Sequence, residues 1–109
     1  MGAKNLVALL IFLAAAALEI GGDALIRKGM RGMGGGFIIT GIIALGSYGV
    51  VVNTVKWDFS KLLGVYIAVF ATMSVLFSRF VFKEAVPGTR LIGISLIIIG
   101  GLIIQFWTK

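Results

Sequence analysis

The sequence predicts an all-α integral membrane protein, a bundle of four transmembrane helices. Of its 109 residues, 60% are hydrophobic, and the mean hydropathy is +1.13. Soluble domains contain only about 45–50% apolar residues. The hydrophobic residues form four runs of about 17–22 residues, the length that crosses a hydrocarbon core of about 30 Å. Such a chain has no room for a second domain, so we expect a single domain over residues 1–109.

The first expected helix covers about residues 5–26 and follows Lys4. This opening, with an apolar run that ends in four alanines, also resembles a signal peptide with a small-residue cleavage site. The apolar run continues through Ala24, Leu25 and Ile26, beyond the length of such a signal. A membrane-spanning helix is therefore the favoured interpretation.

The other three expected helices are separated by short polar connections. Residues 27–36 are basic and rich in glycine but lack a phosphate-loop pattern, so they predict a flexible turn. Residues 56–61 contain Trp57, which suits the headgroup region, and residues 83–90 contain the sole proline. The remaining helices are expected at about residues 37–55, 62–82 and 91–107.

The charge pattern excludes several classes of function. The net charge is +6, but the basic residues flank the hydrophobic runs and do not form one patch, so we expect no nucleic-acid partner. Cysteine and histidine are absent, which removes disulfides, thiol chemistry, imidazole bases and the usual transition-metal ligands. We therefore expect no metal and no cofactor. We also expect no enzymatic activity, because no second acid elsewhere at membrane depth offers an acid/base pair.

The basic residues also indicate how the helices cross the membrane. Four spans place both termini on one side. The terminal side carries Lys4, Lys56, Lys61 and Lys109, and the opposite side carries Arg27, Lys28, Arg31, Arg79, Lys83 and Arg90. Four charges against six weakly favour termini outside, and insertion in both orientations stays open. Arg79 lies near the end of its helix, where snorkelling to the interface is favoured over contact with a substrate.

Glu19 is the main candidate functional residue. It lies inside the first apolar run, with Asp23 one turn and Arg27 two turns further along the same helix face. A charged carboxyl group in hydrocarbon is costly unless it is neutralised, paired or hydrated. Glu19 is therefore expected to hold a proton or a cationic substrate in alternation. Asp23 either extends this acidic site or pairs with Arg27, and both interpretations stay open.

Three hydroxyl groups at membrane depth are further candidates. Tyr48 lies in the second run, and Tyr66 and Ser74 lie in the third. Tyr66 and Ser74 are eight residues apart, hence roughly on one helix face. They either line a polar pathway beside Glu19 or form interhelical hydrogen bonds that hold the bundle together.

Glycines in the fourth run predict self-association. Gly93 and Gly100 are one heptad apart and share a helix face, and Gly101 is adjacent. We expect these three residues to pack against a second chain. A dimer is also favoured because four short helices enclose too little volume for a sizeable pathway.

The chain resembles the small multidrug resistance family of the drug/metabolite transporter superfamily over essentially its whole length. Glu19 in ALEIGGDALIRKG corresponds to that family's first-helix glutamate, and residues 91–104 are similar to its glycine-spaced dimerisation helix. The Phe82-Lys83-Glu84 turn before Pro87 is also of this kind. The resemblance implies a dimer, commonly antiparallel, whose paired glutamates exchange protons for quaternary ammonium or guanidinium compounds.

The third helix departs from that family. Typical members carry A-Y-A-x-W-x-G-x-G there, whereas residues 62–70 have no tryptophan and a single glycine, Gly64. Residues 59–61, Tyr66 and Ser74 are more similar to the YnfA-like branch of small membrane proteins. The resemblance therefore implies the architecture and the role of Glu19, but it does not identify the substrate.

The sequence thus predicts a proton-coupled exporter of small organic cations in the cell (inner) membrane. Its expected partners are the cation, protons, membrane lipid and a second identical or related chain. One alternative is a flippase for lipid-linked or amphipathic substrates, which would meet anionic headgroups through Arg27 or Arg79. Another is a non-transporting membrane subunit of a larger complex.

Overall fold

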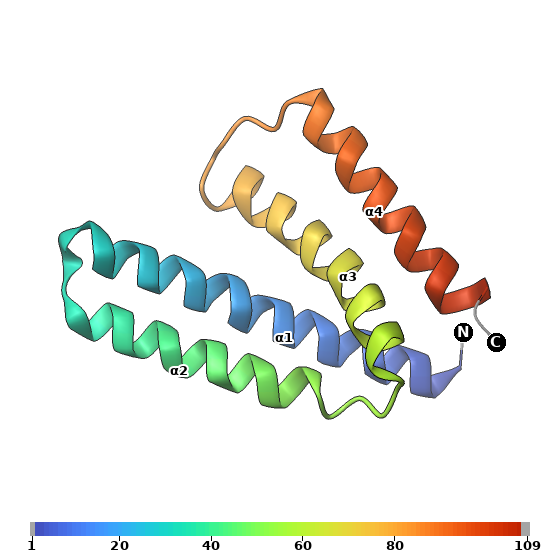
Figure 1. Ribbon diagram of the computed structural model, residues 1–109. Coiled ribbons are helices and arrows are strands. Elements are labelled where there is room, and N and C mark those ends of the chain that lie inside the picture. Colours follow the sequence, from blue (N-terminus) through green and yellow to red (C-terminus); the bar gives the residue numbers. More distant parts are fainter. Residues whose placement is uncertain (1, 108–109) are drawn as a thin grey trace. The chain divides into compact units, whose positions relative to one another are not determined.

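The computed structural model describes residues 2–107 and confirms the all-α class. Four long helices and one short π-helical turn follow one another along the chain (Figure 1). All four of these helices have the length and the apolar composition needed to cross a membrane, so the chain is a multi-pass membrane protein. The elements are α1 (Ala3–Lys28), η1 (Gly29–Met33), α2 (Gly35–Val52), α3 (Phe59–Phe80) and α4 (Gly88–Trp107).

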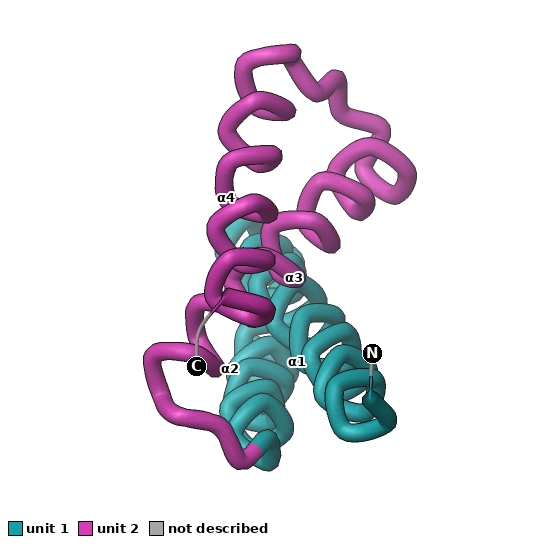
Figure 2. Tube along the Cα trace, turned by 90° about the vertical axis from the view of Figure 1, so that its right-hand side faces the viewer, with its two compact units in different colours: residues 1–55 teal, residues 56–109 magenta. Residues whose placement is uncertain are grey.

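The helices form two compact units, shown in teal and magenta in Figure 2. The first unit, residues 1–55, contains α1, η1 and α2. The second, residues 56–109, contains α3 and α4. Each unit is a hairpin of two helices that pack against each other, as short connections between successive membrane spans require.

The turn of the first hairpin depends on two glycines in the basic segment. Helical geometry ends at Arg31 (φ −91°, ψ 18°), and Gly32 follows with a φ of 105°. Gly34, just before α2, has a φ of 109°. Only glycine adopts such positive φ angles readily, because it has no Cβ atom to clash with the backbone. The predicted turn is thus formed by these two left-handed residues.

The connection between α2 and α3 is shifted toward the N-terminus relative to the prediction, because α2 ends at Val52, three residues before the expected end. α3 begins at Phe59, three residues before the expected start, and the Asp58 carbonyl accepts the Leu62 N–H at 2.9 Å. Hydrophobicity locates the span, but the helix extends into the polar turn because backbone hydrogen bonds continue there. The Lys61 ammonium lies 4.3 Å from the centre of the Trp57 ring, a cation–π contact.

The second hairpin is closed by the segment around the proline. α4 begins at Gly88, directly after Pro87, whose carbonyl accepts the N–H groups of Arg90 and Leu91 at 3.0 and 3.3 Å. Proline suits this position because it has no N–H to leave unsatisfied at a helix start. The helix therefore begins three residues earlier than expected, and because α3 ends two residues earlier, at Phe80, the turn is mainly shifted along the chain.

The two helices of the second hairpin touch through small residues. A Cβ atom on Gly101 of α4 would lie 2.5 Å from the Ala68 Cβ of α3, closer than real Cβ contacts. A Cβ on Gly64 of α3 would lie 2.5 Å from the Ile104 Cδ1 of α4. From this contact α3 and α4 diverge toward the connection at residues 81–87 (Figures 1 and 2).

Candidate functional site

Glu19 lies on α1 near the middle of the helical segment Ala3–Met33, and it is half-buried. Its carboxyl group interacts electrostatically with the Tyr48 hydroxyl of α2. Tyr48 is also half-buried. Two residues that the sequence names separately, on different helices, thus come together in the first hairpin.

A close approach of α1 and α2 sets this pairing. A Cβ on Gly22 would lie 2.9 Å from both the Gly41 carbonyl oxygen and the Leu45 Cγ. A Cβ on Gly41 would lie 2.7 Å from the Gly22 carbonyl oxygen and 2.6 Å from the Ile26 Cγ1. Both glycines are buried. The helix backbones meet here because neither residue has a side chain to hold them apart.

The contacts form a regular register along the hairpin. Gly29 faces Ile38, Ile26 faces Gly41, and Gly22 faces Leu45. Each step of three or four residues back along α1 is matched by an equal step forward along α2, as expected for antiparallel helices. The next step places Glu19 opposite Tyr48, in agreement with their electrostatic interaction.

The same register sets the surroundings of the pair. One further step places Ala15 opposite Val52, and both residues are almost completely buried, with exposed fractions of 0% and 2%. On the other side of the pair lies the close contact of Gly22 with Leu45. Along the hairpin, Glu19 and Tyr48 therefore lie between two closely packed helix–helix contacts.

Asp23 and Arg27 do not form an ion pair. Both side chains are exposed, and neither makes a salt bridge or hydrogen bond to another residue in the range 2–107. Asp23 and Arg27 thus lie on α1 as predicted, but their side chains do not pair with each other. Asp23 is available as a second acid one turn from Glu19.

Tyr66 and Ser74 lie on α3, in the second hairpin. Tyr66 is buried, with 3% exposure, and its ring centre lies 6.2 Å from that of Phe70. The Ser74 hydroxyl donates a hydrogen bond to the Ala71 carbonyl at 2.9 Å, within its own helix. Ser74 therefore makes a helix-internal bond of the kind common for serine in membrane spans. A role for either residue beside Glu19 stays a prediction.

The three glycines of α4 lie in different surroundings. Gly101 contacts Ala68 within the chain. Gly93 and Gly100 have no atom within 4 Å of the position that a Cβ would occupy. Gly101 is thus part of the α3–α4 contact, whereas Gly93 and Gly100 leave an open surface on the helix. Packing against a second chain stays a prediction for these residues.

Sequence reasoning missed several residues that shape these hairpins. Gly22 carries the α1–α2 contact, yet it precedes Asp23 as one of two adjacent glycines without any distinguishing signal. Ser78 donates a hydrogen bond to the Glu84 Oε1 at 2.6 Å across the end of α3. A spacing of six residues between a serine and an acid does not indicate a hydrogen bond in the sequence, so this bond is visible only in the structure.

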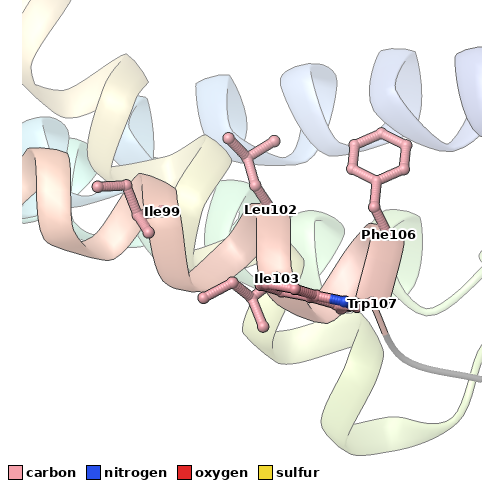
Figure 3. Close-up of a pocket in the computed structure, with 5 residues that line it drawn as sticks. All are labelled: Ile99, Leu102, Ile103, Phe106 and Trp107. Carbon is pink, nitrogen blue, oxygen red and sulfur yellow. The ribbon is translucent and has the colours of Figure 1, made fainter.

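A shallow apolar pocket of about 380 Å³ lies on the C-terminal half of α4 (Figure 3). Its five lining residues all come from this helix, and they are Ile99, Leu102, Ile103, Phe106 and Trp107. None carries a charge, and the Trp107 indole N–H is the one polar side-chain group among these five residues, so this surface offers little to orient a ligand. Within residues 2–107, no group of three or more acidic side chains could hold a metal ion.

Comparison with known proteins identifies the family. A search of curated proteins and a search of solved structures each gave no match. The family model described as "Uncharacterised BCR, YnfA/UPF0060 family" matches residues 5–109. This match includes all four helices except the first residues of α1, and it contains both Glu19 and Tyr48. The chain therefore belongs to the YnfA/UPF0060 family.

Proposed function

We propose that this protein is a proton-coupled exporter of small organic cations and that Glu19 holds the proton or the cation in alternation. The observation that carries the proposal is the position of Glu19 at membrane depth, on the face of α1 that lies opposite Tyr48 of α2. Acidic residues inside membrane spans are rare and mark ion or substrate pathways. The four-span architecture and the resemblance to small multidrug resistance proteins support the same function.

The chemistry of the pair suits a cation with N–H groups or a quaternary ammonium. The carboxylate provides a negative charge, and the Tyr48 hydroxyl can accept a hydrogen bond from a guanidinium. The aromatic ring adds a cation–π surface. A proton competes for the same carboxylate, so the gradient of one species can drive the other without a further coupling device.

Export requires that the carboxyl group be reached from each side of the membrane in turn. We propose that a dimer provides this, with one helical bundle rocking against the other around the two Glu19 residues. We place the protein in the cell (inner) membrane and propose that it acts as a transporter, not as an enzyme. A related chain could replace the identical partner, and Asp23 could share the proton.

The experiment that tests this function is electrical. The purified protein is reconstituted in liposomes on a solid-supported membrane and perfused with guanidinium, quaternary ammonium and anionic compounds. Glu19→Gln should abolish the cation-induced currents, because the amide cannot exchange a proton. Asp58→Asn is the matched control, since Asp58 is an exposed acid in the connection before α3 and should leave the currents unchanged.

The outcomes separate the proposed function from its rivals. Cation currents that persist in Glu19→Gln would refute the role of Glu19. Silence toward every cation in folded protein, together with currents or scrambling for anionic amphipathic compounds, would indicate a flippase. Silence toward all compounds, with a stable partner in a pull-down, would indicate a subunit of a larger complex.

A further inference from the structure

A groove of about 410 Å³ lies between α3 and α4, next to the connection at residues 81–87. Its polar lining comes from Ser74, Ser78 and Arg90, and its apolar lining includes Gly93, Ile94 and Ile97. The groove belongs entirely to the second hairpin. None of its lining residues belongs to the first hairpin, which contains Glu19 and Tyr48.

The groove exists because the two helices diverge. They touch at Gly101 and Ala68, and the groove lies toward the opposite end of the hairpin, where α3 and α4 spread apart (Figure 2). Gly93 leaves space on the α4 side, since nothing lies within 4 Å of the position of its missing Cβ. A larger side chain at this position would project from the wall into open space.

One basic residue, Arg90, lines the end of the groove nearest the connection, and the neighbouring chain segment is also basic. Residues 78–90 contain Arg79, Lys83 and Arg90 but only one acid, Glu84. The Glu84 carboxylate accepts a hydrogen bond from the Ser78 hydroxyl at 2.6 Å. The backbone N–H of Glu84 donates a second hydrogen bond to the Ser78 carbonyl at 2.9 Å. Among the described residues, none of the three basic side chains forms an ion pair. The local surplus of two positive charges is therefore uncompensated within residues 2–107.

The groove is polar at one end and apolar along the rest, which matches the headgroup and the acyl chain of a lipid. Arg90 lies in the first turn of α4, at the end of the membrane span where headgroups lie. Ile94 and Ile97 lie one and two turns further into the span, and Ile97 is about 10 Å deeper than Arg90 at 1.5 Å per residue. Guanidinium groups bind phosphate oxygens with two parallel hydrogen bonds.

We propose that this groove binds a phospholipid with an anionic headgroup. Its phosphate would lie at Arg90, and one acyl chain would follow Ile94 and Ile97 along α4. Charge complementarity selects this occupant, because Arg90 has no acidic partner among the described residues and the lining deeper along α4 is apolar. A zwitterionic lipid of the same chain length should bind more weakly, since its headgroup carries no net charge to match the rim.

Native mass spectrometry of the purified protein provides the test. Lipid binding is titrated with phosphatidylglycerol and with phosphatidylcholine of identical acyl chains. The unmodified protein should retain phosphatidylglycerol preferentially. Arg90→Gln should weaken this binding about fivefold, the effect of removing one basic residue next to an anionic lipid. Arg31→Gln is the matched control, because it removes an equal charge from an exposed residue in the turn of the first hairpin.

A second pair of variants tests the apolar part of the groove while leaving all charges in place. Gly93→Leu fills it from α4, and Val75→Phe fills it from α3, where Val75 also lines the wall. Both should weaken phosphatidylglycerol binding at least threefold. Circular dichroism and oligomeric state are measured for each, so that a folding defect in one variant does not decide the outcome.

Several results would overturn the proposal. Equal losses in Arg31→Gln and Arg90→Gln would show that overall charge, not the groove, attracts the lipid. Full binding in both filled variants would exclude an acyl chain in the groove. Complete displacement of the lipid by inorganic phosphate would indicate an anion site without a lipid. A changed oligomeric state in both filled variants, with unchanged lipid binding, would assign the groove to a second copy of the chain.

Discussion

Single glycines decide how closely the helices of each hairpin approach. Gly22 and Gly41 bring the backbones of α1 and α2 into contact, and this contact lies three residues from Glu19 along α1. Gly46 lies on the same helix as Gly41 but has nothing within 4 Å of its missing Cβ. The two positions therefore differ only in what surrounds them, which makes them a matched pair for mutation.

Gly41→Ala should destabilise the first hairpin by about 2 kcal/mol, because the new methyl group would lie 2.7 Å from the Gly22 carbonyl oxygen, a backbone atom that cannot rotate away. Gly46→Ala should leave the stability unchanged or raise it by up to about 1 kcal/mol, since alanine favours the helix and meets no neighbour. Unfolding in sodium dodecyl sulfate, followed by circular dichroism, measures both. Equal effects of the two substitutions would contradict the α1–α2 register.

The register has a consequence for the candidate site. It places Tyr48 opposite Glu19, so loosening the Gly22–Gly41 contact should also disturb the carboxyl–hydroxyl pair. A site held by helix packing is sensitive to small displacements at neighbouring positions. Gly41→Ala should accordingly reduce any transport activity more than Gly46→Ala does, even at temperatures where both variants stay folded.

At the scale of the elements, the turn between α1 and α2 is specified by backbone conformation and not by side-chain contacts. Gly32 has a φ of 105° and has no neighbour within 4 Å of its missing Cβ. Gly36, a few residues on, has an equally open environment but lies inside α2 with helical geometry. Comparing these two positions separates conformational strain from steric conflict.

Gly32→Ala should lower the stability of the first hairpin by about 1–2 kcal/mol, because residues with a Cβ atom are strained at positive φ. Gly36→Ala is the control and should be neutral or slightly stabilising, since its backbone already suits alanine. Hydrogen exchange at the amides of η1 provides a local measurement beside the global one. Faster exchange there in Gly32→Ala alone is the expected result.

At the scale of the whole molecule, α4 presents large apolar residues to its surroundings. Leu96, Ile99, Leu102 and Phe106 are each more than half exposed. Gly101 is already used within the chain, whereas Gly100 is open. Lipid or a second copy of the chain can cover such a surface, and the open glycine lets another helix approach closely. We propose that the dimer forms here.

Gly100→Leu should weaken this dimer roughly tenfold or more, which corresponds to about 1.4 kcal/mol. The hairpin itself should fold normally, because nothing within the chain lies near the Gly100 Cβ position. Gly101→Leu should instead impair folding of the second hairpin, because its Cβ would collide with Ala68 and disrupt the α3–α4 contact. Single-molecule photobleaching in liposomes measures the dimer, and circular dichroism measures the fold. An unchanged dimer in Gly100→Leu would exclude this face.

The class of the molecule, the number of spans and the main candidate residue, Glu19, could all be predicted from the sequence. These depend on local composition: an apolar run long enough for a bilayer forms a helix, because its backbone polar groups must be satisfied within the segment. An acid inside such a run is visible without any knowledge of its neighbours. The helix ends differed from prediction by up to three residues in both directions. All four helices start before the expected residue, whereas α2 ends at Val52 and α3 at Phe80, before the expected residues 55 and 82.

Which polar residues lie near one another followed from the packing of the helices. The α1–α2 register places Glu19 opposite Tyr48, Asp23 and Arg27 form no mutual ion pair, and the Ser74 hydroxyl bonds to a carbonyl of its own helix. The packing also distinguishes Gly101 from Gly100, which are adjacent in the sequence but have different surroundings. The reason is physical: spacing along one helix sets which residues share a face, whereas the register between two helices depends on how their surfaces interlock.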